Sequence, residues 1–272
     1  MSKKKILFVT QELNPYTEVS ILSDIAKQIP HFATDEGYEI RILMPKFGVI
    51  NERRHRLHEV VRLSGMNIIV DDEDYPLIIK VASLPGLRLQ VYFLDNDEFF
   101  KRKAIFHDDD NVAFDDNQER IVFFCKGVME TVKKFGWAPD IVYLNGQITS
   151  LIPLYLKKAY KNDPIFQDSK IVYSFYEDTI SHSFNEKFLR IAAINDLEPA
   201  DLEIYRIGDE INLDLGAFVN CDGIIAGNEI ANEFVNKHED KINIPKSLFT
   251  SDEELARETI AFFKTVLQDT QE

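Results

Sequence analysis

Polar and aromatic side chains gather directly after three apolar runs of this chain. The runs are residues 5–10, 140–144 and 170–175, and each has the composition of a strand buried in a parallel sheet. In open sheets of parallel strands, ligands bind at the carboxyl ends of the strands. Carboxylate, amide and phenol groups placed there suit the hydroxyl groups of a carbohydrate or a small polyol. The candidate residues of such a cleft are Glu12, Tyr16, Asp24, Asn145, Gln147, Tyr176 and Glu177.

Each candidate also has a purely structural explanation. Glu12 could order the loop that carries it, and Asp24 could accept hydrogen bonds from backbone N–H groups near the start of a helix. The other candidates could be surface loop residues that bind no ligand. His182 lies between Ser181 and Ser183, but no nucleophile elbow of the Gly-x-Ser-x-Gly type surrounds these serines. We therefore predict no catalytic residue.

Motifs for cofactors and metals are missing from the sequence. It contains no zinc-type ligand spacing and no phosphate-binding glycine motif. The acidic runs 71–74 and 108–110 could hold a hard cation through their carboxylate oxygens, but both lack the glycine and the terminal glutamate of a calcium loop. We predict that both runs are solvated loops and that the protein has no cofactor and no metal site.

Composition limits the class of protein and its partners. The chain has 272 residues, 45% of them hydrophobic, which suffices for one large or two small domains. A net charge of −15 argues against nucleic acid or an anionic membrane as a partner. Cys125 and Cys221 lie in apolar runs, which favours buried free thiols in a reducing compartment. No run is long enough for a signal peptide or a membrane span, so we expect a cytoplasmic protein.

Strand-like and helical segments alternate along the chain. This alternation predicts an α/β fold with one doubly wound, Rossmann-like parallel sheet. Ser251 and Glu254 have capping-box spacing and predict a final helix of about 251–268 that packs back onto a single domain of residues 1–272. The predicted strands are 5–10, 39–44, 87–94, 140–144, 170–175 and 223–226, and the predicted helices are 19–32, 118–135, 148–158 and 228–237.

The segment after the first strand resembles a known family. It keeps Glu12, Pro15, Leu22 and Asp24 at the spacing of the opening motif of glycogen and starch synthases, where Glu-x-x-Pro leads into Lys-x-Gly-Gly-Leu-x-Asp-Val. Weaker similarities follow in the family's order at 37–48, 91–96, 116–124 and 136–142. The resemblance implies the N-terminal, acceptor-side domain of a GT-B glycosyltransferase. We expect the donor-binding domain of that architecture to be absent from residues 1–272.

Other residues stand where the family carries its chemistry. The family's lysine is Glu18, its two glycines are Ser20 and Ile21, and the last histidine of a second motif is Ile148. A turn that cradles a diphosphate needs glycines and a cation or a helix N-terminus. A like charge there is unfavourable by about 4 kcal/mol at about 4 Å and an effective dielectric near 20. The resemblance therefore implies the family's scaffold without its nucleotide-sugar site.

Three kinds of function follow from this resemblance. The leading hypothesis is a synthase-related domain, non-catalytic by itself, that acts as a binding or regulatory module for an α-glucan or for a protein partner. The second is transfer of glucose from ADP-glucose to an α-1,4-glucan, with the donor-binding domain supplied by another chain. The third is a subunit of a complex, such as a homo-oligomer, whose interface is the surface that faces the donor domain in the family.

Overall fold

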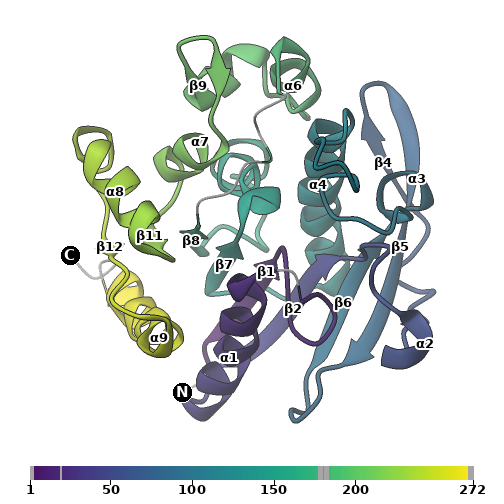
Figure 1. Cartoon of the computed structure of the whole chain (residues 1–272), viewed down its shortest axis with the longest axis horizontal. Coiled ribbons are helices and arrows are strands. Elements are labelled where there is room, and N and C mark those ends of the chain that lie inside the picture. Colours follow the sequence, from purple (N-terminus) through teal and green to yellow (C-terminus); the bar gives the residue numbers. More distant parts are fainter. Residues whose placement is uncertain (1–2, 19, 177–179, 181–183, 269–272) are drawn as a thin grey trace.

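A computed structural model describes residues 3–18, 20–176, 180 and 184–268 of the chain. A mixed sheet forms its middle layer, and helices cover both faces of the sheet (Figure 1). The connections explain this arrangement. The chain steps in one direction across the sheet from β1 (Lys5–Thr10) to β2 (Glu39–Pro45) and in the opposite direction from β6 (Gln90–Asp95) to β7 (Ile141–Asn145). Right-handed crossovers therefore place the linking helices α1 (Ile21–Asp35) and α4 (Asn117–Phe135) on opposite faces.

Parallel pairing forms most of the sheet. The strand order is β12-β11-β8-β7-β1-β2-β6, and every neighbouring pair in this series is parallel. The central strands are apolar and almost fully buried, as a sheet covered on both faces requires. The strands are β1 (Lys5–Thr10), β2 (Glu39–Pro45), β6 (Gln90–Asp95), β7 (Ile141–Asn145), β8 (Lys170–Phe175), β11 (Gly223–Ala226) and β12 (Lys246–Ser247).

One edge of the sheet is antiparallel, and the sequence analysis missed it. There β5 (Glu73–Ser83) pairs with β6, β3 (His58–Glu59) and β4 (Met66–Val70). Of the acidic run 71–74, predicted as a solvated loop, Asp71 and Asp72 do form a turn, that of the β4–β5 hairpin, whereas Glu73 and Asp74 begin β5. Asp71 and Asp72 adopt positive φ angles of 49° and 66° there. Asp71 also forms ion pairs with Lys187 and Arg190.

Helices complete the two outer layers. In Figure 1, α1 (purple) and α9 (yellow) lie side by side, and α4 (teal) lies across the strands from them. None of the described helices is long and apolar enough to cross a lipid bilayer. The α-helices are α1 (Ile21–Asp35), α2 (Glu52–His55), α3 (Asp97–Phe100), α4 (Asn117–Phe135), α5 (Ile152–Leu154), α6 (Glu186–Ile191), α7 (Leu213–Val219), α8 (Glu229–Lys237) and α9 (Asp252–Gln268).

The segment 148–158, predicted as one regular helix, changes form along its length. A 3₁₀ turn covers Gln147–Thr149, α5 follows, and Tyr155–Ala159 is π-helical. Pro153 has no N–H group and stands in the first turn of α5, where that group would have no partner within the helix. Further 3₁₀ turns lie at Pro199–Tyr205 and Glu239–Lys241, and β9 (Arg206–Ile207) pairs with β10 (Glu210–Ile211).

Helix α9 packs closely against the sheet. Phe263 is fully buried, and its ring lies edge-on to that of Tyr143 on β7, with a centroid separation of 5.1 Å. A Cβ atom on Gly223 would lie 2.9 Å from side-chain atoms of both Phe262 and Val266. Only glycine therefore allows β11 and α9 to approach this closely.

Replacing Phe263 with alanine tests this packing. We expect Phe263→Ala to lower the free energy of unfolding by about 3–5 kcal/mol, because it removes a buried aromatic ring from a tight interface. Urea unfolding followed by circular dichroism measures the loss. Lys264→Ala is the matched control, since Lys264 forms an exposed ion pair with Glu36 and its loss should barely move the unfolding midpoint. Equal midpoints for both variants would show that α9 does not stabilise the sheet.

Candidate functional site

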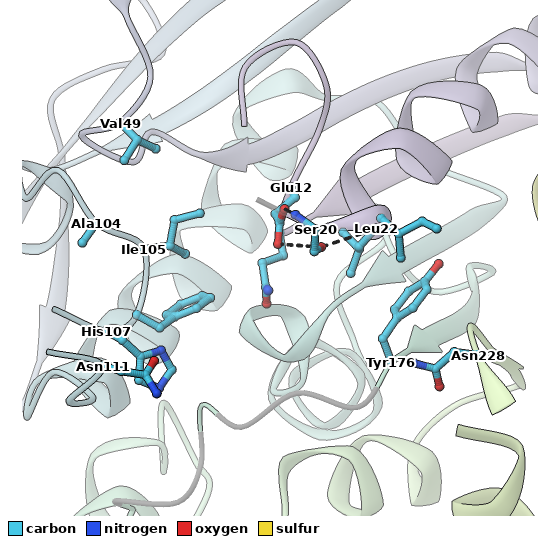
Figure 2. A pocket seen from close by; sticks show the side chains of 13 residues that line it. Glu12, Ser20, Leu22, Val49, Ala104, Ile105, His107, Asn111, Tyr176 and Asn228 are labelled. Carbon is cyan, nitrogen blue, oxygen red and sulfur yellow. Dashed lines mark hydrogen bonds between the residues drawn. The ribbon is translucent and has the colours of Figure 1, made fainter. Parts of the chain in front are cut away.

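A cleft of about 550 Å³ opens at the carboxyl edge of the sheet. Its lining comes from the loops that follow several strands, as the fold class predicts. Figure 2 shows Glu12, Ser20 and Leu22 in the middle, Tyr176 and Asn228 at one side, and His107 and Asn111 at the other. The complete lining is Gln11, Glu12, Ser20, Ile21, Leu22, Val49, Ala104, Ile105, Phe106, His107, Asn111, Tyr176 and Asn228.

The carboxylate of Glu12 lies at the amino end of α1. It is only 4% exposed and accepts hydrogen bonds of 3.1 Å from both the backbone N–H and the hydroxyl of Ser20 (Figure 2). Ser20 is the N-cap of α1, and its hydroxyl oxygen accepts a hydrogen bond from the N–H of Leu22 at 3.2 Å. A helix N-terminus carries partial positive charge and favours an anion. The protein's own carboxylate therefore occupies the position where α1 would hold the anion of a ligand.

The loops after β1 and β7 lock together beside Glu12. The N–H of Gln11 donates to the carbonyl of Asn145 at 2.9 Å, and the side-chain oxygen of Gln11 accepts from the N–H of Ile148 at 3.3 Å. Gly146 has a φ angle of +90°, and a Cβ atom there would lie 2.7 Å from the Cβ of Gln11. Both facts require glycine at this position.

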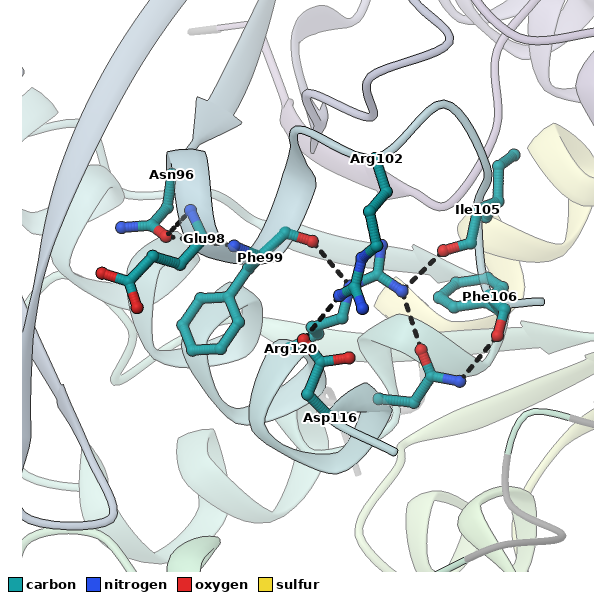
Figure 3. Close-up of polar contacts among 9 residues, drawn as sticks. Asn96, Glu98, Phe99, Arg102, Ile105, Phe106, Asp116 and Arg120 are labelled. Atoms are coloured by element: carbon teal, nitrogen blue, oxygen red, sulfur yellow. Dashed lines mark hydrogen bonds and ion pairs between the residues drawn. The ribbon is translucent and has the colours of Figure 1, made fainter. Parts of the chain in front are cut away.

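Arg120 of α4 holds the wall of the cleft that contains Ile105 and Phe106. Its guanidinium donates to the carbonyls of Phe99 at 2.8 Å and Ile105 at 2.6 Å, and to the side-chain oxygen of Asn117 at 2.7 Å (Figure 3). The side-chain amide of Asn117 in turn donates to the carbonyl of Phe106 at 2.9 Å. This network fixes the backbone of a loop that has no regular secondary structure.

The charge of Arg120 lies in an aromatic environment. Its side chain is fully buried, and burial is the main cause that lowers its pKa to about 9, with a further contribution from the nearby cation Arg102. Arg120 is therefore still positively charged at neutral pH. Aromatic rings stabilise such a cation through their electron-rich faces. The rings with centroids within 5.4–5.7 Å of the guanidinium carbon belong to Phe47, Phe100, Phe106 and Phe114.

Tyr176 separates this cleft from a second one of about 410 Å³ and lines both. A Cβ atom on Gly227 would lie 2.2 Å from the Tyr176 ring, so only glycine admits the ring in this place. Burial raises the pKa of the Tyr176 hydroxyl well above its ordinary value, which keeps the group protonated. In the second cleft, the buried carboxylate of Asp214 accepts hydrogen bonds from Gln147 at 2.6 Å and from the Tyr173 hydroxyl at 2.7 Å.

The structure groups only part of the predicted cleft. Glu12 and Tyr176 line the first cleft, and Gln147 and Tyr176 line the second. Tyr16 lines neither, because its hydroxyl donates to the carbonyl of Ser83 at 2.9 Å. Asp24 is exposed on α1 and accepts a hydrogen bond from the side chain of Asn14. Asn145 is fully buried and lines neither cleft. Glu177, Ser181, His182 and Ser183 lie outside the described residues.

The positions that depart from the family motif also differ in their surroundings. Ser20 and Ile21 line the first cleft at the start of α1. Ile148 is fully buried, and its carbonyl accepts a hydrogen bond from the Cys125 thiol at 3.0 Å. Glu18 is exposed and does not line the cleft. The carboxylate at the amino end of α1 is therefore that of Glu12, a position shared with the family motif, and its partner Ser20 is the position that departs from the motif.

Several lining residues of the two clefts were not singled out from the sequence, among them His107, Asn111, Asp214 and Asn228. Asn228 and Asp214 do carry a sequence signal, since each lies at the start of a helix. That signal indicates helix capping and a favourable first turn, not a ligand site. His107 and Asn111 belong to the irregular loop before α4, for which no periodicity exists.

Comparison with known proteins decides the family. The sequence model described as "Starch synthase catalytic domain" matches residues 5–241. The chain belongs to this family. Glycogen synthase from Chlorobium limicola is 36% identical over 212 residues, which is 77% of this chain and 42% of that protein. Glycogen synthase from Chlorobaculum tepidum is 40% identical over 176 residues, which is 63% of this chain and 36% of that protein.

A solved structure of a starch synthase shares the fold of this chain. The catalytic domain of starch synthase IV from Arabidopsis thaliana, bound to ADP and acarbose, superposes with a TM-score of 0.72 at 16% sequence identity. The match covers 93% of this chain and 53% of that one. This member of the starch synthase catalytic domain family thus spans about 42% of the length of its Chlorobium limicola relative.

The Arg120 network gives a prediction for the cleft wall. We expect Arg120→Met to lower the free energy of unfolding by about 2–4 kcal/mol, because buried carbonyl groups lose their hydrogen-bond donor. Hydrogen exchange of the amides between α3 and α4 should also become faster. Arg102→Met is the control: its half-exposed ion pair with Asp116 should contribute less than about 1 kcal/mol. An Arg120→Met protein as stable and as well protected as the wild type would contradict this role.

Proposed function

We propose that this chain binds an α-glucan oligosaccharide at the two clefts of its carboxyl edge and does not transfer glucose by itself. The observation that carries the proposal is the pair of hydrogen bonds between Ser20 and the Glu12 carboxylate. Through these bonds, donor groups at the amino end of α1 are already engaged by a carboxylate of the protein itself. A nucleotide sugar that placed its diphosphate there would have to displace this buried carboxylate or accept its repulsion.

Neutral polar groups and aromatic surfaces in the clefts support a saccharide ligand. The Tyr176 side chain lines both clefts, the Asn228 amide lines the first, and the Gln147 amide lines the second. Such groups bind sugar hydroxyls without requiring a charged ligand. Starch synthase IV from Arabidopsis thaliana was solved with ADP and acarbose bound. We propose that the present chain likewise binds a saccharide, but no nucleotide.

A second candidate function is half of a two-part glucosyltransferase. Several apolar side chains at the carboxyl edge are partly or largely exposed, and exposed apolar surface of this kind marks an interaction face. A donor-binding domain on another chain would cover this surface and could supply the missing nucleotide contacts. The exposed side chains are Ile21 (51%), Val49 (40%), Ile207 (38%) and Ile230 (48%), all of which line one of the two clefts.

Glucan binding is tested by calorimetric titration of the purified chain with maltoheptaose. We expect saturable binding, weakened about tenfold by Tyr176→Ala, because that variant removes the aromatic wall that the two clefts share. Tyr38→Ala is the matched control. Tyr38 precedes β2 at the opposite edge of the sheet, so its loss should leave the affinity unchanged. If the wild type takes up no maltoheptaose, or if Tyr176→Ala binds as tightly as the wild type, the glucan proposal fails.

The absence of transfer is tested with radiolabelled ADP-glucose and maltoheptaose. The purified chain should incorporate no more label than a protein-free blank, because the hydroxyl of Ser20, which stands where the family has a glycine, holds the Glu12 carboxylate at the amino end of α1. Glycogen synthase from Chlorobium limicola serves as the active control. Elongation of maltoheptaose by this chain alone would refute the claim. Elongation only after addition of a donor-binding partner would favour the second candidate function.

A further inference from the structure

A second kind of polar surface lies at the opposite edge of the sheet. A groove of about 430 Å³ runs along the amino ends of β2 and β6 and the β5–β6 hairpin, which projects at the bottom of the view in Figure 1. None of its residues lines either cleft of the carboxyl edge. The lining residues are Glu39, Ile40, Arg41, Ser83, Arg88, Leu89, Gln90 and Tyr92.

Aromatic rings hold Arg41 in place within this groove. Its guanidinium carbon lies 4.7 Å from the ring centroid of Phe135 and 4.7 Å from that of Trp137. Tyr92 supports the stack through an edge contact with Phe135 at 4.9 Å. Stacking fixes the plane of a guanidinium and leaves its N–H groups, which lie in that plane, available to a ligand. No described residue forms a hydrogen bond or an ion pair with the Arg41 side chain, in contrast to Arg120 on the other side of the molecule.

The charges around the groove favour an anion locally. Arg41 and Arg88 are both positive, and Glu39 is the one acidic residue among the groove-lining side chains. The carboxylate of Glu39 is engaged by the indole N–H of Trp137, which donates to it at 2.6 Å. Arg88 is exposed on the β5–β6 hairpin and forms no ion pair with any described residue. The groove therefore carries a net positive charge in a chain whose total charge is −15.

From this geometry we infer that the groove is a binding site for phosphate or a phosphate ester. The fork of Arg41 donates two parallel hydrogen bonds to the oxyanion, as arginine does at bidentate sites. Arg88 approaches the same anion from the hairpin. The site is separate from the proposed glucan clefts and does not depend on that proposal.

Calorimetric titration with inorganic phosphate at constant ionic strength tests the site. The wild type should bind phosphate saturably, while acetate at the same concentration gives no comparable signal. Arg41→Lys should weaken binding at least about tenfold, because lysine keeps the charge but lacks the planar fork. Arg88→Gln should weaken it as well. Lys101→Gln removes one exposed positive charge after α3, at the other end of β6, and should leave phosphate binding unchanged.

Three results would overturn this assignment. The first is the absence of saturable phosphate binding by the wild type. The second is undiminished binding by Arg88→Gln, which also decides the question if Arg41→Lys does not fold. The third is competition between maltoheptaose and phosphate, since that would place the anion in the carboxyl-edge clefts. Loss of maltoheptaose binding with retained phosphate binding would instead refute only the glucan proposal.

Discussion

The contact between Glu12 and the amino end of α1 determines what the main cleft can bind. A nearly buried carboxylate needs hydrogen-bond donors, and the first turn of a helix has N–H groups without partners. Ser20 meets both needs through its backbone N–H and its hydroxyl. An incoming diphosphate would compete for the same donors, and a like charge about 4 Å away would cost roughly 4 kcal/mol at an effective dielectric near 20. A neutral saccharide is not repelled by the carboxylate and does not have to take the donors that Ser20 provides to it.

The rest of the carboxyl edge is held by contacts that leave little freedom to its loops. Gly146 and Gly227 allow Gln11 and Tyr176 to pack where any Cβ atom would collide. Arg120 fixes the facing loop through the carbonyl of Ile105, and the rings of Phe106 and Phe114 from the same loop lie over its guanidinium. The buried parallel sheet sets where these loops begin, but it does not determine which polar side chains the loops carry. The family fold and the chemistry of the cleft are therefore separate questions.

The sequence predicted the parallel core because its strands are continuous apolar runs, and β1, β8 and β11 have the predicted bounds. It missed β5, whose alternating pattern includes Pro76 and charged residues and resembles a loop. The cleft was predicted only in part. Glu12 was recognised as a candidate, but its partner Ser20 lies eight residues away, and no local pattern specifies that bond. Asp214 was missed because its hydrogen bond to Gln147 spans 67 residues, a distance over which sequence spacing carries no information.

A crystal structure of the protein grown with ADP-glucose would test the central claim most directly. The decisive feature is the occupant of the amino end of α1. Our account predicts that the Glu12 carboxylate stays within hydrogen-bond distance of the Ser20 N–H, with no phosphate group on that N–H. A diphosphate bound to the Ser20 N–H, with the Glu12 side chain turned away, would contradict it.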